Sequence, residues 1–215
     1  MRPDRFRRLR TVLSRRQPDL TVLMERVNKP HNFAAILRNC DAVGVMEAHV
    51  VPPKHGLDFH PAAAGGTRKW IDVTTHPSVE PAVALLKARG FRILAAHPSE
   101  SATDFRAVDY TRPTALLMGA ELYGVSDTGL DLADEHLTIP MMGMVHSLNV
   151  SVATALLLYE AQKQRFAAGM YDECRLDPAA FQRILFRWTH PVLARHLDAL
   201  GTPYPTLDDH GDPMF

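Results

Sequence analysis

The sequence predicts an α/β protein whose mostly parallel sheet is covered by helices on both faces. Short runs that are mostly apolar, such as residues 91–96, or continuously apolar, such as 115–118, have the length of buried strands, and they alternate with stretches of helical periodicity. The chain has 215 residues, of which 46% are hydrophobic and 22% charged, so it can bury a core of the size that such a sheet needs. These observations favour one α/β domain with additional segments at its ends.

A basic helix is predicted at residues 5–15, where Phe6, Leu9, Val12 and Leu13 form a narrow apolar stripe. Residues 1–16 hold seven of the 24 basic residues and one of the 24 acidic ones, which leaves 17 basic and 23 acidic residues for the rest of the chain. A basic arm on an acidic body favours a polyanionic partner, nucleic acid first, over a helix whose arginines only serve solubility.

The next elements form the body of the sheet. Strands are predicted at residues 20–27, 47–51, 91–96, 115–118 and 137–140, with helices between them at 33–43, 81–90 and 127–134. The first of these helices has an apolar stripe, with Asn32 as its expected N-cap and Gly44 just beyond its end. Residues of the stripe are Phe33, Ile36, Leu37 and Cys40.

The last helix of the body begins near Ser147 and ends before Gly169. Residues 150–159 are apolar almost all round, which predicts burial on most sides, and the helix turns polar beyond Glu160. Ser147 and Asn149 lie at its positive N-terminal end, where unpaired N–H groups collect. We therefore expect Ser147 to be the N-cap and Asn149 a polar residue of the first turn.

Composition divides the chain into four parts. We expect a basic helical arm at residues 1–19, an α/β domain at 20–168, a helical C-terminal extension at 169–201 and a tail at 202–215. The extension contains predicted helices at 178–187 and 191–200. The tail is rich in Pro and Asp, so we expect it to be disordered.

The sequence gives no support to several classes of protein: disulfide-stabilised, metal-binding, secreted and membrane proteins. Cys40 and Cys174 form no CxxC pattern, which argues against a disulfide framework and against a zinc site. His55, Asp58 and His60 lack the spacing of metal ligands, so no metal is expected. No apolar run has the length of a membrane span and no signal peptide is visible, so we expect the cytoplasm and no membrane partner.

Polar loops follow several predicted strands. His97, residues 119–124 and residues 140–149 come after carboxyl ends, where parallel sheets bind their ligands. There is no GxGxxG after the first strand, no Walker lysine loop, no GxSxG and no HExxH. Backbone-rich loops of this kind suit a ligand with many hydrogen-bonding groups, such as a nucleoside. Residues 65–70 combine glycines, cations and a Trp, which suits phosphate and base contacts or a plain surface turn.

Three segments resemble, in order, the three motifs of the SPOUT family of RNA methyltransferases, in its 2′-O-methylating branch. The first, HNFAAILR, contains Asn32 and Arg38 in an Asn-x5-Arg pattern. The second, LLMGAELYGVS, contains the acidic residue Glu121, and the third, IPMMGMVHSLNVSVATALLLYE, contains Ser147 and Asn149. The resemblance covers most of the chain, and it is greatest to the members that act on guanosine 18 of tRNA.

This resemblance implies an α/β fold whose C-terminal part is threaded into a deep trefoil knot, a rare exception among protein folds. It also implies a homodimer whose final helices pack together, with S-adenosylmethionine bound in the knot largely by backbone groups. The implied cofactor-binding residues are His97, Gly119, Ala120, Glu121, Leu122, Gly124, Ile139, Met141, Ser147, Leu148 and Asn149.

The implied reaction is an in-line methyl transfer to the ribose 2′-hydroxyl of guanosine 18 in the D-loop of tRNA. No metal is needed, because the leaving thioether is neutral. Arg38 is expected to position the RNA phosphate and the hydroxyl rather than to act as a base, since the pKa of arginine lies above about 12. The implied catalytic residues are Arg38, Asn32, Glu121, Ser147 and Asn149.

RNA binding is expected to be shared among basic side chains, by resemblance Arg5, Arg8, Arg16, His31, Lys163 and Arg165. Three other functions stay open: a ribosomal-RNA ribose 2′-O-methyltransferase of the same family, a catalytically inactive RNA-binding SPOUT protein, and a metal-binding protein that uses the eleven histidines. The short basic arm favours tRNA, because ribosomal-RNA relatives commonly carry a larger N-terminal RNA-binding domain. Intact motif residues argue against an inactive protein.

Overall fold

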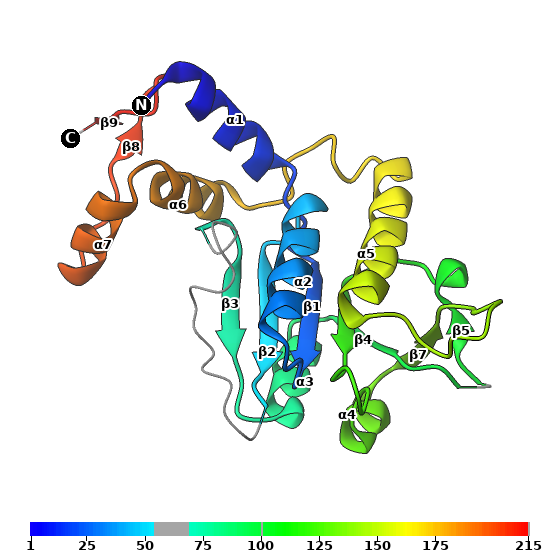
Figure 1. Cartoon of the computed structure of the whole chain (residues 1–215). Coiled ribbons are helices and arrows are strands. Elements are labelled where there is room, and N and C mark those ends of the chain that lie inside the picture. Colours follow the sequence, from blue (N-terminus) through cyan, green and yellow to red (C-terminus); the bar gives the residue numbers. More distant parts are fainter. Residues whose placement is uncertain (54–68, 100, 215) are drawn as a thin grey trace. The chain divides into compact units, whose positions relative to one another are not determined.

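The computed structural model describes residues 1–53, 69–99 and 101–214, which divide into two compact units (Figure 1). The larger unit is Gln17–Ala168, and the smaller one joins Met1–Arg16 to Gly169–Phe215. The expected arm and C-terminal extension therefore form one unit instead of two separate segments. The possible metal ligands His55, Asp58 and His60, and the glycines of the loop at 65–70, lie outside the described residues.

The sheet of the larger unit has seven strands in the order β3-β2-β1-β6-β4-β7-β5, and all neighbouring pairs are parallel. The predicted α/β class is thereby confirmed. Two short edge strands were not predicted, because β3 reads DVTT without apolar alternation and β5 has only two residues. The strands are β1 (Leu20–Glu25), β2 (Glu47–Val51), β3 (Asp72–Thr75), β4 (Arg92–Ala96), β5 (Thr103–Asp104), β6 (Thr114–Met118) and β7 (Glu135–Thr138).

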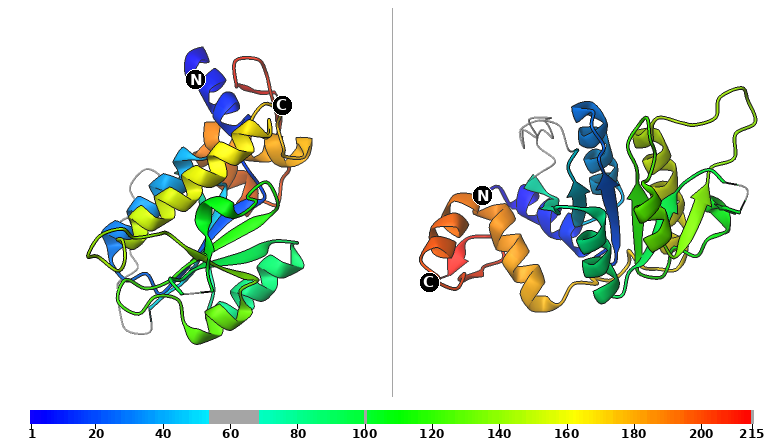
Figure 2. Two further views of the ribbon diagram at one scale, coloured as in Figure 1. Left: turned by 90° about the vertical axis from the view of Figure 1, so that its right-hand side faces the viewer. Right: turned by 90° about the horizontal axis from the view of Figure 1, so that it is seen from below.

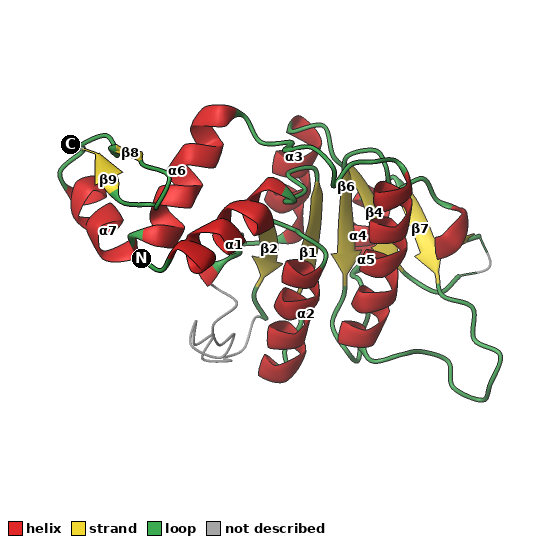
Figure 3. Ribbon diagram, turned by 90° about the horizontal axis from the view of Figure 1, so that it is seen from above, coloured by secondary structure: helices red, strands yellow, loops and turns green. Residues whose placement is uncertain are grey.

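Helices cover both faces of this sheet, as predicted (Figure 3). On one face lie α2 (Pro30–Ala42) and α5 (Val150–Ala167), and on the other α3 (Val79–Ala88) and α4 (Asp127–Leu132). Side chains of β1 alternate between these two cores: Val22 faces α2 and α5, whereas Leu23 faces α3. Burial on both faces explains why the central strands read as continuous apolar runs.

The two helices α2 and α5 lie side by side (Figure 2). Asn39 Nδ2 of α2 donates a hydrogen bond to the carbonyl oxygen of Ser151 at 3.0 Å, which joins the middle of α2 to the start of α5. No helix in the described part of the chain is both long and apolar enough to cross a membrane.

In the smaller unit, α1 (Pro3–Ser14) packs against α6 (Pro178–Thr189), and α7 (Pro191–Ala199) follows. Of the predicted stripe on α1, the residues at spacing i, i+3 and i+7 are buried, namely Phe6, Leu9 and Leu13, while Val12 is exposed. The larger unit also contains a short 3-10 turn, η2 (Phe105–Ala107).

Residues 202–214 were expected to be disordered, but the structure shows a hairpin of β8 (Thr206–Leu207) and β9 (Pro213–Met214). Asp208 explains the difference, because its Oδ1 accepts the N–H of Asp212 at 2.8 Å and closes the connecting turn. Pro and Asp are turn residues as well as residues of disordered segments, so composition alone could not separate the two.

Candidate active site

Four loops gather at the carboxyl edge of the sheet. Strands β1, β6, β4 and β7 are neighbours and run parallel, so the segments that follow them lie at one edge. These segments are the start of α2, residues 119–124, the residues from His97 onward, and residues 139–149. The strand order therefore brings together three motifs that lie far apart in the sequence.

A row of three polar side chains links these motifs. Asn32 Nδ2 donates to Glu121 Oε1 at 2.7 Å, and Asn149 Nδ2 donates to Asn32 Oδ1 at 3.1 Å. Asn32 is only 1% exposed, so both ends of its amide are satisfied inside the protein. The orientation of the Asn32 amide follows, because its NH₂ group must face the carboxylate.

Glu121 also holds the start of α2. Its carboxylate accepts the backbone N–H groups of Asn28 and Lys29, each at 3.1 Å. Burial by itself would raise the pKa of Glu121, but the hydrogen bonds from Asn32 and from the backbone outweigh it and hold that pKa below its ordinary value. An ionised carboxylate is therefore maintained at the positive end of the helix.

The starts of both site helices differ from the prediction. α2 begins at Pro30, which has no N–H to leave unpaired, so Asn32 lies within the first turn and is not the N-cap. In α5 the N-cap is Asn149, whose Oδ1 accepts the N–H of Ser151 at 2.8 Å. Ser147 precedes the helix and is exposed, so its predicted capping role is wrong.

The second motif forms a closed loop between β6 and α4. Ala120 and Gly124 exchange two backbone hydrogen bonds of 2.9 and 2.8 Å, and Gly124 has a φ of +67°. A Cβ atom on Gly119 would lie 1.9 Å from the carbonyl carbon of Gly124, so only glycine fits there. Leu122 and Tyr123 at the tip are 81% and 84% exposed. The loop is fixed at its base and open at its tip.

Glu25 also holds this loop, and it was not predicted from the sequence as a site residue. Glu25 ends β1 and is buried, and its Oε2 accepts the backbone N–H of Ser126 at 3.0 Å. Glu25 lies inside the strand predicted at residues 20–27, and no local signal identifies the partner of its carboxylate. Only the pairing of β1 with β6 places Glu25 below the loop.

The exposed face of α2 carries two basic side chains. His31 and Arg38 are two helical turns apart on one face, both are exposed, and the small Ala34 and Ala35 lie between them. Within the described residues the guanidinium of Arg38 takes part in no ion pair or hydrogen bond. Arg38 is therefore available to a ligand.

The third motif contributes an open loop. Within the described part of the chain, no hydrogen bond involves residues 140–148, most of which are exposed. Ile139 packs against the core below, and Met141 and Leu148 are partly buried. The N–H and C=O groups of this loop are thus available to a bound molecule.

His97 lies at the same edge, directly after β4. Its backbone N–H donates to the carbonyl oxygen of Leu137 at 3.0 Å, and its ring meets that of His136 edge-on with centroids 6.0 Å apart. Among the described residues, no group of three His, Cys, Asp or Glu side chains is arranged to hold a metal ion.

Two of the predicted RNA-binding residues are buried in the structure, and their role in RNA binding stays a prediction. Arg16 is 1% exposed, and its guanidinium carbon lies 5.3 Å from the centre of the Trp188 ring in a cation–π contact. Arg165 is 0% exposed. The other four are exposed: Arg5, Arg8, His31 and Lys163.

Arg165 is bound entirely within the larger unit. Its Nη1 donates to Asp19 Oδ1 at 2.6 Å and to Gln17 Oε1 at 3.2 Å. Its Nε donates to the carbonyl oxygen of Tyr110 at 2.8 Å, and its Nη2 to those of Asp19 and Arg112, both at 3.1 Å. A guanidinium has five N–H donors, so none is left for a phosphate.

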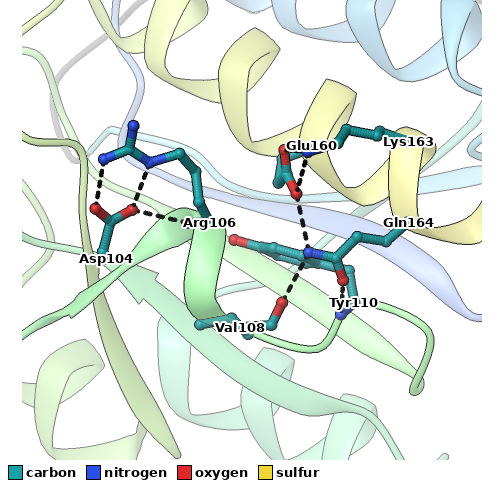
Figure 4. Close-up of polar contacts among 7 residues, drawn as sticks. All are labelled: Asp104, Arg106, Val108, Tyr110, Glu160, Lys163 and Gln164. Atoms are coloured by element: carbon teal, nitrogen blue, oxygen red, sulfur yellow. Dashed lines mark hydrogen bonds and ion pairs between the residues drawn. The ribbon is translucent and has the colours of Figure 1, made fainter.

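Gln164 secures the same part of α5 (Figure 4). Its Nε2 donates to the carbonyl oxygen of Val108 and to Glu160 Oε1, both at 3.0 Å, and its Oε1 accepts the N–H of Tyr110 at 2.9 Å. Lys163 pairs with Glu160 at 3.2 Å, but its side chain remains 75% exposed. Of the two basic residues near the end of α5, Arg165 is therefore held inside the protein and Lys163 faces solvent.

The parallel sheet and the three linked loops at its carboxyl edge are the architecture of an α/β protein that binds a ligand at this edge. The chain belongs to the SpoU rRNA Methylase family, whose model matches residues 19–159, and the model described as SpoU, rRNA methylase, C-terminal matches residues 163–212.

Named relatives cover nearly the whole chain. It is 51% identical over 214 residues to the tRNA (guanosine(18)-2'-O)-methyltransferase of Escherichia coli (strain K12), an alignment that covers 99% of this chain and 93% of that protein. The solved A. aeolicus TrmH/SpoU tRNA modifying enzyme is 42% identical with a TM-score of 0.80, over 86% of this chain and 94% of the other. The SpoU methyltransferase AviRb from Streptomyces viridochromogenes, solved with the cofactor AdoMet, is 29% identical with a TM-score of 0.63, over 70% and 60% of the two chains.

Proposed function

We propose that this protein transfers a methyl group from S-adenosylmethionine to the ribose 2′-hydroxyl of a guanosine in tRNA, guanosine 18 of the D-loop. The observation that carries the proposal is the hydrogen-bonded row of Glu121, Asn32 and Asn149, which links three motif loops beside the exposed Arg38. The Escherichia coli relative, matched along 93% of its length, is named for this reaction.

The open loop at residues 140–148 supports S-adenosylmethionine as the donor. Adenine, ribose and an amino-acid group need many hydrogen-bonding partners, and this loop has its backbone groups unpaired within the described chain. The AviRb relative is named as a complex with AdoMet. When bound, the cofactor supplies a methyl group on a sulfonium, which leaves as a neutral thioether. We propose that the cofactor contacts implied by the resemblance come from three segments: His97; Gly119, Ala120, Glu121, Leu122 and Gly124; and Ile139, Met141, Ser147, Leu148 and Asn149.

Arg38 is proposed to hold an RNA phosphate beside the target ribose and to stabilise negative charge that develops on the 2′ oxygen. The side chain is exposed on α2, and a guanidinium offers N–H donors and no acceptor, so it acts as a donor and not as a base. Asn32, held at both ends by Glu121 and Asn149, keeps the first turn of α2 in place. The contribution of these residues is orientation, and Ser147 in the open loop is proposed to complete the reaction site.

The smaller unit is proposed to hold the tRNA. It contains 11 basic and 8 acidic residues, which leaves 13 basic and 16 acidic of the 24 of each kind for the larger unit. Arg5 and Arg8 are exposed on its helix α1. In the larger unit, Lys163 is exposed on α5 and is proposed as a further phosphate contact. If these side chains bind phosphates, the affinity for tRNA falls steeply with salt concentration.

We further propose a homodimer built on α5 and a trefoil knot in the C-terminal part of the larger unit. Val152, Leu156 and Tyr159 are exposed at spacing i, i+4 and i+7, and so form an apolar stripe opposite the buried side of α5. A second copy of the chain would cover this stripe. Sedimentation of Leu156→Lys should then show a smaller species than the wild-type protein.

Methylation of separate tRNA and ribosomal-RNA pools with labelled S-adenosylmethionine tests the proposal. The expected result is label in tRNA, mapped to the 2′ oxygen of guanosine 18. Label in ribosomal RNA alone would establish the second candidate function, which the family description favours. Cofactor binding by calorimetry without transfer to either pool would establish an inactive RNA-binding protein.

A further inference from the structure

Tyr123 is an aromatic side chain that stands in solvent beside the proposed reaction site. It is 84% exposed, and its neighbour Leu122 is 81% exposed. Large apolar side chains at such exposure, adjacent to one another, mark places where something else binds. Within the described residues, the Tyr123 ring has no aromatic or cation–π partner.

The backbone that carries Tyr123 is fixed. Ala120 and Gly124 close the loop by two hydrogen bonds of 2.9 and 2.8 Å. Glu121 is bonded to Asn32 at 2.7 Å, and the N–H of Ser126 beyond the loop is bonded to a buried carboxylate. A ring held on a rigid loop loses little conformational entropy when a flat ligand stacks on it.

The ring also has the right neighbours for a nucleotide. Glu121, two residues before Tyr123, accepts the N–H of Lys29 at 3.1 Å, so the loop is joined to the first residues of α2. The exposed face of that helix carries His31 and Arg38. Basic groups for a phosphate next to an exposed aromatic ring for a base are the combination with which proteins bind single nucleotides of RNA.

We propose that Tyr123 stacks on the base of the target nucleotide and thereby holds its ribose toward Arg38. This inference rests on the proposed function, in which a nucleotide of a folded RNA is the substrate. A nucleotide drawn out of its stack loses the neighbours on both faces of its base, and a protein ring replaces one of them. Stacking uses the face of the ring, so the phenol hydroxyl is not required.

A double-mutant cycle tests the stacking. Wild-type and Tyr123→Ala proteins are assayed on two tRNA transcripts, one with guanosine at the target position and one with an abasic ribose there. On the guanosine transcript, Tyr123→Ala should lower kcat/KM by about tenfold or more. On the abasic transcript, the same substitution should cause no further loss, because the partner of the ring is already missing. Tyr123→Phe should restore most of the wild-type rate.

Equal losses on both transcripts would overturn the proposal. So would a rise in the Kd for S-adenosylmethionine that matches the loss of activity, or a change in oligomeric state, because the ring would then belong to the cofactor pocket or to a dimer contact. Leu85→Ala removes another exposed apolar side chain, on α3, where no part of the proposed site lies, and should leave kcat/KM unchanged. A wild-type protein that methylates no tRNA would refute the proposed function itself, whereas an active wild type with equal losses refutes only the stacking.

Discussion

Arg165→Leu should destabilise the protein strongly, although a position near the polar C-terminal end of α5 suggests a surface role. The substitution removes all five hydrogen bonds of the guanidinium and its ion pair with Asp19, whose N–O distance is 2.6 Å. The Arg165 side chain is 0% exposed and that of Asp19 is 17% exposed, so the carboxylate would lose its partner with little water to replace it.

The expected loss of stability is estimated from the Arg165–Asp19 ion pair and not from a sum over the five hydrogen bonds. Five charged hydrogen bonds at about 1.5–3 kcal/mol each would exceed the stability of many whole domains, so they cannot be additive. Removing one partner of a buried ion pair costs about 3–5 kcal/mol. At about 2–4 °C per kcal/mol for a chain of this size, the Tm should fall by about 6–20 °C.

Thermal unfolding by circular dichroism measures this effect, at a fixed protein concentration because the Tm of an oligomer depends on it. Lys163→Leu is the matched control, since Lys163 is 75% exposed and pairs only with Glu160 among the described residues. Its loss should change the stability by less than about 1 kcal/mol. In tRNA binding the roles reverse: Lys163→Leu should reduce the dependence of affinity on salt, and folded Arg165→Leu should not.

A different pair of results would refute this reasoning. If the Tm of Arg165→Leu lies within about 2 °C of the wild-type Tm, the substitution changes the free energy of unfolding by less than about 1 kcal/mol. If it also binds tRNA weakly and with a shallower salt dependence, then Arg165 is a phosphate ligand, as the family resemblance implied.

Three further predictions concern the site and the edge of the sheet. Arg38→Ala should abolish methyl transfer and leave the Kd for S-adenosylmethionine nearly unchanged by calorimetry; equal loss of both would make Arg38 structural. Gly119→Ala should lose cofactor binding as well as transfer, since its Cβ would lie 1.9 Å from backbone across the loop, and wild-type affinity would contradict that geometry. His49 Nδ1 lies 2.9 Å from His76 Nε2, and burial lowers the pKa of His49 to about 4 although Glu47 opposes this. The unfolded side chain titrates near 6.5, so the folded state binds fewer protons and the free energy of unfolding should fall as the pH drops from about 7 to about 4. A double variant, His49→Gln with His76→Gln, should lose less free energy of unfolding than the wild type between about pH 7 and about pH 4. Urea titrations at several pH values measure this loss.

Much of the fold was predictable because its signals are local. The central strands are buried on both faces, so each appears as a mostly apolar run, and the stripe of α2 repeats at helical spacing. The edge strands β3 and β5 escaped because they are short and only partly buried, and pairing with β2 and β7 defines them.

The site was predictable as a set of residues but not as an arrangement. Asn32, Glu121 and Asn149 were chosen from motif positions, and the structure shows that they form one hydrogen-bonded row. Their local roles were assigned less well, because the choice of N-cap depends on which residue the tertiary fold lets begin the helix. Glu25 was missed since its partner Ser126 lies 101 residues away.

By itself, the sequence determined the α/β class and the basic arm, because periodicity and charge are properties of neighbours along the chain, and its resemblance to a known family supplied the residues of the three motifs. Only the tertiary structure decided which polar groups are paired and which are presented to a ligand. Arg165 and Lys163 look alike in sequence, yet the first is enclosed by groups up to 148 residues away and the second faces solvent. Burial depends on what the fold brings close, and that information is not contained in any short stretch of the chain.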